Sequence, residues 1–309
     1  MEEKYLIGLD IGGTKCAVVL GDEKGNVVEK VRFATRSDLG PDHAIGQLLD
    51  NAQLLAQKYP VAAVGISCGG PLDGARGVVL SPPNLPGWDA IPICDMVTRR
   101  LGVPAFLRND ADACALAEHR YGNGKGMDNM IFLTFGTGMG AGLILNGRLY
   151  AGGCNMAGEV GHMRMTQEGP VGYGKAGSFE GWCSGGGIAQ QASMKLAGTY
   201  EAKLQWDARF MAQAANSGDP VAQELFREVG ANLGRGLAVL IDILNPDAIV
   251  IGGIYPRAMK LLRPAMDKVL DAECLPQNRR HCRILPALLG ESIGDVAALC
   301  VAGDGLERR

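Results

Sequence analysis

Apolar residues in this chain occur either in short continuous runs or at the spacing of one helix face, and the two patterns follow each other repeatedly. Continuous apolar runs bounded by turn residues predict buried strands at 61–67, 103–108, 248–251 and 283–285. Helical spacing predicts helices at 42–58, 93–101, 186–196, 206–216, 221–244, 256–272 and 293–302, and one more that ends at Tyr121. Such alternation is typical of an α/β fold whose helices cover mostly buried sheets.

The chain also contains an internal repeat. Residues 5–20 and 130–145 each read as a strand, a glycine turn and a second strand, and a reverse turn follows both. When Asp10 is aligned with Thr134, the glycine turns and the ends of the apolar runs coincide. Two similar halves that face each other would each offer a glycine turn to one shared cleft.

Length and composition set the overall organisation. A chain of 309 residues is long for one hydrophobic core, so we expect two domains. The first is expected at 1–113, joined by a C-terminal helix at 291–309, and the second, larger one at 114–290. The net charge of −3 leaves no broad basic surface, which argues against nucleic acid as the main partner.

Cysteine usage and the lack of long apolar runs indicate the compartment. Nine cysteines are present, and none forms a CxC or CxxC pair, which suits reduced thiols that are mostly buried. No apolar stretch reaches the roughly 18 residues of a membrane helix, and the N-terminal strand is too short for the core of a signal peptide. We therefore expect a cytoplasmic protein without a membrane partner.

The first glycine turn has the residues of a phosphate-binding loop. Gly12 and Gly13 carry no side chains, so backbone N–H groups can approach phosphate oxygens. Thr14 and Lys15 add a hydroxyl donor and a positive charge, and Asp10, at the end of the preceding strand, could hold Mg²⁺ through water. Taken alone, the same residues also suit an ordinary tight hairpin, and it is the repeat of the turn that favours the functional interpretation.

The second turn and a third glycine segment extend this hypothesis to a whole nucleotide. The second turn has the same character as the first, and a glycine pair follows the strand 248–251 just before a helix. An adenine or ribose would fit there against bare backbone, although a plain strand-to-helix turn is the alternative. The candidate nucleotide-binding residues in this half are Thr134, Gly136, Thr137, Gly138, Gly252 and Gly253.

A short acidic segment, Asn109-Asp110-Ala111-Asp112, lies where a strand gives way to a helix. By position alone, Asp110 suits an N-cap and Asp112 a first-turn acid. In the functional interpretation, Asp110 accepts the proton of an attacking hydroxyl and Asn109 fixes the substrate by hydrogen bonds. Phosphoryl transfer requires mainly an oriented nucleophile and neutralised charge, so one carboxylate with Mg²⁺ and amide donors suffices.

Further polar loop residues suit a ligand with several hydroxyl groups. Glu159 and His162 follow the second hairpin, and Glu180 lies in a glycine-rich stretch at 169–187 that we expect to form a functional loop. Carboxylates and imidazole bind adjacent hydroxyls, although solvated loop glutamates and structural histidines are the common alternatives. Gly70 and Asn84 lie in two further loops that could line the same cleft.

Seven segments of the chain, taken in order, resemble the ROK family, which contains sugar kinases and repressors. They span almost the whole chain and are specific in combination: 10–15, 70–71, 84–88, 109–111, 134–140, 158–162 and 245–253. The resemblance implies a duplicated, actin-like (ribonuclease H-like) ATPase fold with two domains around a central cleft, usually as a homodimer. It also implies ATP and Mg²⁺ as cofactors and a hexose or N-acetylhexosamine as substrate.

The resemblance assigns roles by position. It implies that Asp110 is the catalytic base when the γ-phosphoryl group of ATP passes to a hexose hydroxyl, and that the two glycine turns are the phosphate loops. The favoured substrate is glucose or a close hexose, phosphorylated at O6, with N-acetylmannosamine, allose and fructose as alternatives. The implied substrate contacts are Gly70, Asn84, Asn109, Asp110, Glu159, His162 and Glu180.

One departure from the family lies in the glycine-rich loop. Members commonly carry a CxCGxxGCxE zinc motif there, whereas Val171, Tyr173 and Ser178 occupy the three cysteine positions in this chain. A structural zinc needs about four sulfur or nitrogen ligands, and His162 alone leaves the site three short. We therefore expect no structural zinc, and a loop held by packing of Tyr173 and Phe179.

Two functions of other classes stay open on the residues alone. Some relatives are sugar-responsive transcriptional repressors, but those carry an N-terminal helix-turn-helix domain, and only about four residues precede the first strand here. A regulatory ATPase of actin-like fold without a sugar substrate is the second alternative, because a fold does not fix a function. A kinase differs from it by consuming ATP only when a sugar is added.

Overall fold

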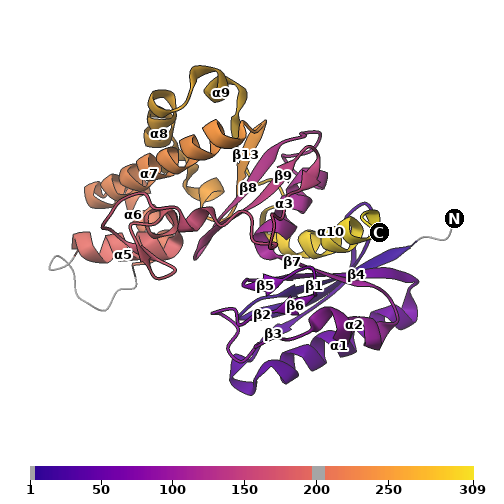
Figure 1. The fold of residues 1–309 in the computed structure, drawn as a ribbon. Coiled ribbons are helices and arrows are strands. Elements are labelled where there is room, and N and C mark those ends of the chain that lie inside the picture. Colours follow the sequence, from indigo (N-terminus) through magenta and orange to yellow (C-terminus); the bar gives the residue numbers. More distant parts are fainter. Residues whose placement is uncertain (1–3, 197–205) are drawn as a thin grey trace. The chain divides into compact units, whose positions relative to one another are not determined.

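A computed structural model describes residues 4–196 and 206–309, and the chain forms two compact units (Figure 1). The first unit contains the residues up to Lys125, together with 149–157 and 289–309. The second contains 126–148 and 158–288. The predicted boundary at residue 113 falls inside a helix of the first unit, which continues as one body to Lys125.

The first unit is built on a five-stranded sheet in the order β3-β2-β1-β4-β7. Its strands are β1 (Tyr5–Ile11), β2 (Lys15–Asp22), β3 (Val27–Ala34), β4 (Val61–Cys68) and β7 (Ala105–Asn109). β1 is antiparallel to β2 and parallel to β4, and β4 is parallel to β7. A small second sheet pairs β5 (Leu72–Asp73) with β6 (Val78–Val79).

Helices cover both faces of this sheet, which explains why β1 is apolar along most of its length. α1 (Pro41–Lys58) and α2 (Ile93–Leu101) pack on the face that carries Ile7, Leu9 and Ile11. α10 (Ile293–Glu307) packs on the opposite face, with Leu6, as Figure 1 shows. Because successive side chains of a strand point to opposite faces, Asp10 belongs to the α10 side.

The second unit repeats this sheet order with its own strands, β10-β9-β8-β13-β14. They are β8 (Met130–Phe135), β9 (Met139–Leu145), β10 (Arg148–Leu149), β13 (Ala248–Ile251) and β14 (Arg283–Pro286). β8 is antiparallel to β9 and parallel to β13, as β1 is to β2 and β4. The internal repeat predicted from the sequence is therefore confirmed, and with it the duplicated α/β fold.

The long helix α7 (Pro220–Leu244) organises the helices of the second unit. It begins after Asp219, whose Oδ1 accepts a hydrogen bond from the N–H of Ala222 at 2.8 Å. It packs closely on α8 (Tyr255–Glu273), because a Cβ atom at Gly230 would stand 2.3 Å from the carbonyl oxygen of Leu262. The other helices here are α4 (Phe179–Cys183), α5 (Gly185–Leu196), α6 (Ala208–Asn216) and α9 (Pro276–His281).

The helices and strands predicted from the apolar pattern are all present, with somewhat different ends; α10, for example, continues to Glu307. The pattern missed the strand β3, the short strands β5, β6 and β10, and the short helices α4 and α9. It also missed a hairpin of β11 (Val171–Gly172) and β12 (Lys175–Ala176). α4 and the hairpin lie within the stretch 169–187 that the sequence predicts as a loop. No helix in the described parts of the chain is both long enough and apolar enough to cross a bilayer.

Candidate active site

Three parallel strands of the first unit end together, and the predicted residues follow their ends. Ile11 of β1, Cys68 of β4 and Asn109 of β7 are aligned across the sheet. The first glycine turn follows β1, Gly70 follows β4 and Asp110 follows β7. Ligands of open α/β sheets bind beyond such strand ends, so the first unit brings these residues to one edge.

The first glycine turn is held from one side. The carbonyl groups of Gly12 and Gly13 accept hydrogen bonds from Thr35 Oγ1 at 2.6 Å and from Ser37 Oγ at 3.2 Å. The carbonyl group of Thr14 accepts from the N–H of Thr35 at 3.0 Å. A trans peptide places its N–H opposite its C=O, so the N–H groups of Gly13 and Thr14 point away from these supports. Backbone donors in such an arrangement suit a phosphate group.

The loop that carries Asn84 lies directly on this turn. A Cβ atom at Gly13 would stand 2.4 Å from the carbonyl oxygen of Asn84, so only glycine fits there. The Asn84 side chain lies over Gly69, where a Cβ atom would be 3.5 Å from its amide atoms. Leu85 and Trp88 are buried and anchor the loop, while Asn84 is exposed. The fold thereby places Asn84 between the turn and the end of β4.

At the end of β7, two neighbouring residues take the roles that the sequence left open. Asn109 is the N-cap of α3 (Asp110–Tyr121), and its Oδ1 accepts a hydrogen bond from the N–H of Asp112 at 2.7 Å. Asp110 is the first helical residue, and its Oδ1 accepts from the N–H of Ala111 at 2.8 Å. The N-cap interpretation of Asp110 is therefore wrong, and a ligand contact by Asn109 falls to its Nδ2 group, which the cap does not use.

Asp10, the next-to-last residue of β1, lies in a negatively charged environment. Burial, and then the charges of Asp295 and Asp110, raise its pKa from 3.8 to about 6, although nearby basic side chains oppose the shift. One of these, Lys30, is held by Asp295 at 2.5 Å. The Asp10 carboxylate faces the start of α10, because a Cβ atom at Gly294 would stand 2.9 Å from its Oδ2.

A cation fits this environment. Burial is the larger cause of the raised pKa of Asp10, and the charges of Asp295 and Asp110 add to it, so a bound cation would stabilise the ionised carboxylate. Within residues 4–196 and 206–309, no group of three or more His, Cys, Asp or Glu side chains is placed to hold a metal ion. A single carboxylate such as Asp10 suits Mg²⁺ that is held mostly by water and by phosphate oxygens, because this ion keeps much of its hydration shell.

In the second unit, the second glycine turn is held by the start of α5. The carbonyl group of Gly136 accepts a hydrogen bond from the N–H of Gly185 at 2.7 Å. That of Thr137 accepts from the N–H of Gly186 at 3.1 Å. The N–H groups that follow these carbonyls point away from α5, just as the N–H groups of the first turn point away from its supports. Both turns thus present backbone donors by the same geometry, although unrelated segments support them.

The glycine pair after β13 touches the same turn. Gly253 has a φ of 64°, and a Cβ atom there would stand 2.1 Å from the carbonyl oxygen of Phe135. That carbonyl accepts a hydrogen bond from the N–H of Ile254 at 2.6 Å. The second unit therefore brings Gly252-Gly253 together with the second turn. Sequence reasoning missed the three consecutive glycines at 185–187, two of which support the turn.

The residue that corresponds to Asp10 in the repeat is neutral. Thr134 is the next-to-last residue of β8, and its Oγ1 accepts a hydrogen bond from the N–H of Gly140 at 3.0 Å. Each unit therefore has its own glycine turn, but only in the first unit does a carboxylate precede it.

Glu180 contacts the second glycine turn. It is the second residue of α4, and its Oε2 accepts a hydrogen bond from the N–H of Met139 at 3.0 Å. A Cβ atom at Gly138 would stand 2.8 Å from the same oxygen. One predicted sugar contact therefore touches the predicted phosphate turn of its own unit.

Glu159 precedes a single short turn of helix, Val160–His162, which His162 ends, and both residues are exposed. The N–H of His162 donates to the carbonyl oxygen of Glu159 at 3.1 Å, which ties the two residues together. The ring of His162 meets the ring of Tyr173 edge-on, with centroids 6.4 Å apart. Tyr173 itself is 68% exposed, so the prediction that it packs inside the glycine-rich loop is wrong.

The glycine-rich loop is held by one buried ring and by hydrogen bonds. The Phe179 ring is fully buried, and a Cβ atom at Gly236 of α7 would stand 2.4 Å from it, which confirms the packing predicted for Phe179. Gln190 of α5 bonds the N–H and the carbonyl group of Val171, at 2.9 and 2.7 Å. Ser178 is the N-cap of α4. Two positions that hold cysteines in the family motif thus hold residues bonded within the protein.

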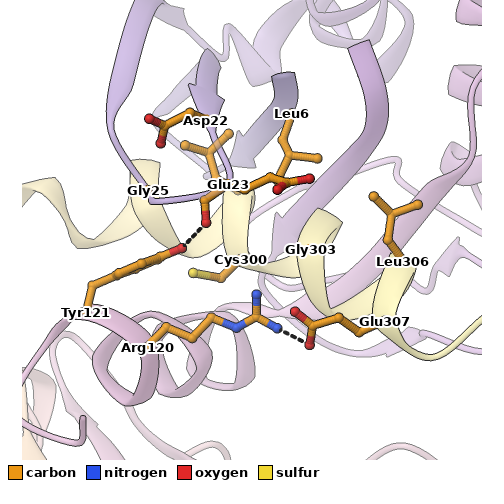
Figure 2. Close-up of a pocket in the computed structure, with 11 residues that line it drawn as sticks. Leu6, Asp22, Glu23, Gly25, Arg120, Tyr121, Cys300, Gly303, Leu306 and Glu307 are labelled. Atoms are coloured by element: carbon orange, nitrogen blue, oxygen red, sulfur yellow. Dashed lines mark hydrogen bonds and ion pairs between the residues drawn. The ribbon is translucent and has the colours of Figure 1, made fainter. Parts of the chain in front are cut away.

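A separate cavity of about 340 Å³ lies in the first unit, at the opposite end of β1 (Figure 2). Leu6 lines it, together with residues of α3 and α10 that include the ion pair between Arg120 and Glu307, at 2.7 Å. Strand geometry separates Leu6 from Asp10 by about 13 Å. None of the predicted site residues lines this cavity, so it is distinct from the candidate site.

Two sheets of the same strand order, each with a glycine turn after its first parallel strand, define the class of this protein as an ATPase of the duplicated, actin-like fold. A family model described as "ROK family" matches residues 6–304. The chain belongs to the ROK family.

Individual relatives agree with this assignment. The chain is 34% identical over 284 residues to the glucokinase of Thermotoga maritima, covering 88% of this chain and 89% of that protein. It is 32% identical over 252 residues to an N-acetylmannosamine kinase of Shigella flexneri, covering 80% and 82%. A ROK family glucokinase from Streptomyces griseus, solved in complex with glucose and AMPPNP, aligns with a TM-score of 0.80 at 32% identity, covering 97% of this chain and 100% of that one.

Proposed function

We propose that this protein is an ATP-dependent sugar kinase that phosphorylates a hexose, with glucose or a close hexose as substrate and O6 as the acceptor. Its family and its identity of 34% with a glucokinase support the sugar kinase class. The observation that carries the proposed mechanism is the place of Asp110. It begins α3 at the strand-end edge that also bears Asp10 and the first glycine turn.

Asp110 is the proposed base. Asp110 is an exposed residue, but desolvation by the surrounding protein raises the pKa of its carboxyl group. The hydrogen bond from the N–H of Ala111 orients this carboxylate. As a sugar hydroxyl attacks the γ-phosphorus in line, its proton passes to this carboxylate, and the bond from phosphorus to the bridging oxygen breaks. Positioned proton transfer of this kind contributes about 10² to 10⁴-fold to a rate.

Each glycine turn is a phosphate-binding loop in this proposal. Its outward N–H groups donate to phosphate oxygens, Lys15 adds positive charge, and the bare backbone at Gly252-Gly253 receives the adenosine. Asp10 would hold Mg²⁺ through water, and the ion would supply charge neutralisation at the phosphates. The pKa of Asp10 is raised first by burial and then by the charges of Asp295 and Asp110, and a cation would compensate both the lost solvation and this negative charge, which supports this role.

Polar side chains and backbone groups bind the sugar in this proposal. Carboxylates accept hydrogen bonds from hydroxyl groups, while amide and imidazole groups donate to them. The contact of Glu180 with the second glycine turn supports a sugar site next to the phosphate site. The proposed contacts are Gly70, Asn84, Asn109, Glu159, His162 and Glu180. N-acetylmannosamine is the second candidate substrate, because a kinase of that name is 32% identical to the chain.

We also propose a homodimer in a reducing, cytoplasmic environment. All nine cysteines are free thiols and most are buried, which supports a reducing compartment. The dimer rests on the family resemblance, and light scattering coupled to size exclusion measures it directly.

A coupled assay of ADP release tests the function. The purified protein is given ATP and Mg²⁺ with each of glucose, mannose, allose, fructose and N-acetylmannosamine. We expect ADP release that depends on added sugar and is fastest with glucose. ADP release that no sugar stimulates would overturn the proposal.

The variant Asp110→Asn tests the base. We expect turnover to fall at least about 10²-fold, with the affinity for sugar within about threefold of the wild type, because the amide keeps the size of the side chain. Asp42→Asn is the matched control, since Asp42 is also an exposed acid in the first turn of a helix. Near-normal turnover of Asp110→Asn would remove Asp110 from the role of base.

A further inference from the structure

Tyr173 stands at the tip of a hairpin within the glycine-rich loop. Residues 171–172 pair with residues 175–176, so Tyr173 and Gly174 alone connect the two strands. Both have positive φ values, 44° and 75°. Asparagine and glycine are the residues that suit such turns, because a bulky side chain is strained in the left-handed region. A tyrosine in this conformation points to a function of its side chain.

The ring of Tyr173 is exposed, yet neighbouring residues fix its position. It meets the ring of His162 edge-on, with planes at 77°. The other strand of the hairpin is tied to the same residue, because Lys175 Nζ donates to the carbonyl oxygen of His162 at 2.6 Å. An exposed aromatic ring that is already held in place loses little freedom when a ligand covers it.

The hairpin also touches a second predicted sugar contact. A Cβ atom at Gly172 would stand 2.8 Å from the Cβ atom of Glu180, so β11 lies directly on the start of α4. Gln190 bonds both backbone groups of Val171 and fixes the base of the hairpin. Tyr173 is therefore the exposed tip of the structure that positions two predicted sugar ligands, an acid and a histidine.

We propose that Tyr173 contacts the sugar and determines its specificity. Its ring packs on the apolar C–H face of the pyranose, while His162 and Glu180 bind the hydroxyl groups at the edge. A pyranose whose substituents are all equatorial, such as β-glucose, offers the flattest face. An axial hydroxyl at C2, as in mannose, disturbs that contact. This inference rests on the proposed function, because it requires a sugar at these residues.

Two substitutions distinguish the effect of the aromatic ring from the effect of the turn conformation. Tyr173→Asn removes the ring but keeps a residue that tolerates positive φ, and Tyr173→Phe keeps the ring. We expect Tyr173→Asn to raise the KM for glucose about tenfold, to leave kcat and the KM for ATP within about twofold, and to lower the preference for glucose over mannose. We expect Tyr173→Phe to stay within about threefold of the wild type in each constant. Tyr150→Asn, which removes another exposed tyrosine, is the matched control.

Calorimetric titration of glucose into each variant gives a second readout that does not depend on turnover, and thermal unfolding shows whether the fold is intact. An active wild type with an unchanged glucose KM and unchanged sugar preference in Tyr173→Asn would overturn this inference and leave the kinase standing. A wild type that releases ADP without any response to sugar would overturn the proposed function and this inference with it.

Discussion

Replacing Asp10 with asparagine should stabilise the protein at pH 8 and have little effect at pH 4. The pKa of Asp10 is raised to about 6 by burial and by the charges of Asp295 and Asp110. A raised carboxyl pKa means that the ionised form is less favourable in the folded chain than in the unfolded one. The folded state is therefore penalised once the pH exceeds 3.8, and fully so above about 6. Asparagine removes the ionisation and the penalty.

The size of the effect follows from the shift. The difference between 3.8 and about 6 corresponds to about 3 kcal/mol in the free energy of unfolding at 1.36 kcal/mol per pKa unit. Asp10 is partly exposed, which weakens these interactions, so we expect the variant to gain about 1 to 3 kcal/mol at pH 8. At pH 4, where the folded-state carboxyl is protonated, the gain falls below about 1 kcal/mol.

Urea unfolding followed by circular dichroism measures the free energy of unfolding of the wild type and of Asp10→Asn at both pH values. The buffer contains a chelator and no nucleotide, so that no cation occupies the site. Asp22→Asn is a control of opposite sign. Although partial burial raises the pKa of Asp22, hydrogen bonds from Asn26 and from the N–H of Lys24 lower it, so its replacement should destabilise the protein at pH 8. A gain for Asp10→Asn that does not change with pH, or a loss at pH 8, would refute the electrostatic reasoning.

Packing and metal content give two further predictions. Gly65→Ala should cost at least about 3 kcal/mol in urea unfolding, because its Cβ atom would stand 2.1 Å from the carbonyl oxygen of Ala298 and 2.3 Å from the nitrogen of Ala302. Gly46→Ala, inside α1 with nothing within 4 Å of the added atom, should instead stabilise by up to about 1 kcal/mol, and equal effects of the two would contradict the contact geometry. Chelator-washed protein should contain far less than one zinc per chain by mass spectrometry of the metal, and one equivalent would show that other ligands replace the missing cysteines.

The parts of the fold that the sequence predicted are those determined locally. The hairpin around Gly12 and its repeat around Gly136 depend on glycines at fixed spacing, and the apolar periodicity of a long helix such as α7 needs no knowledge of its neighbours. Short elements contain too few residues to show such a spacing or periodicity. α9 has six residues, too few to show a helical period, so the sequence could not separate it from a loop.

At the candidate site, the sequence predicted a set of residues but did not predict which of them form the helix cap and which leave their side chains exposed. Asn109 and Asp110 both suit an N-cap, and a shift of one residue in the start of α3 decides which of them caps the helix. Tyr173 was expected in the loop core because aromatic residues usually pack, and only the turn geometry leaves its ring exposed. The support that Gly185 gives to the second turn joins segments far apart in the chain, which no local pattern records.

The position of α10 has a consequence for the order in which the chain is made. Leu299 and Ala302 of this helix complete a hydrophobic cluster with Leu6 and Ala63 on one face of the first sheet. The second unit has all its residues once the chain has reached Leu288, whereas the first still lacks α10 at that point. The unit whose synthesis begins first is therefore the last to be completed, and its sheet lacks the packing of α10 until every residue of the second unit has been made.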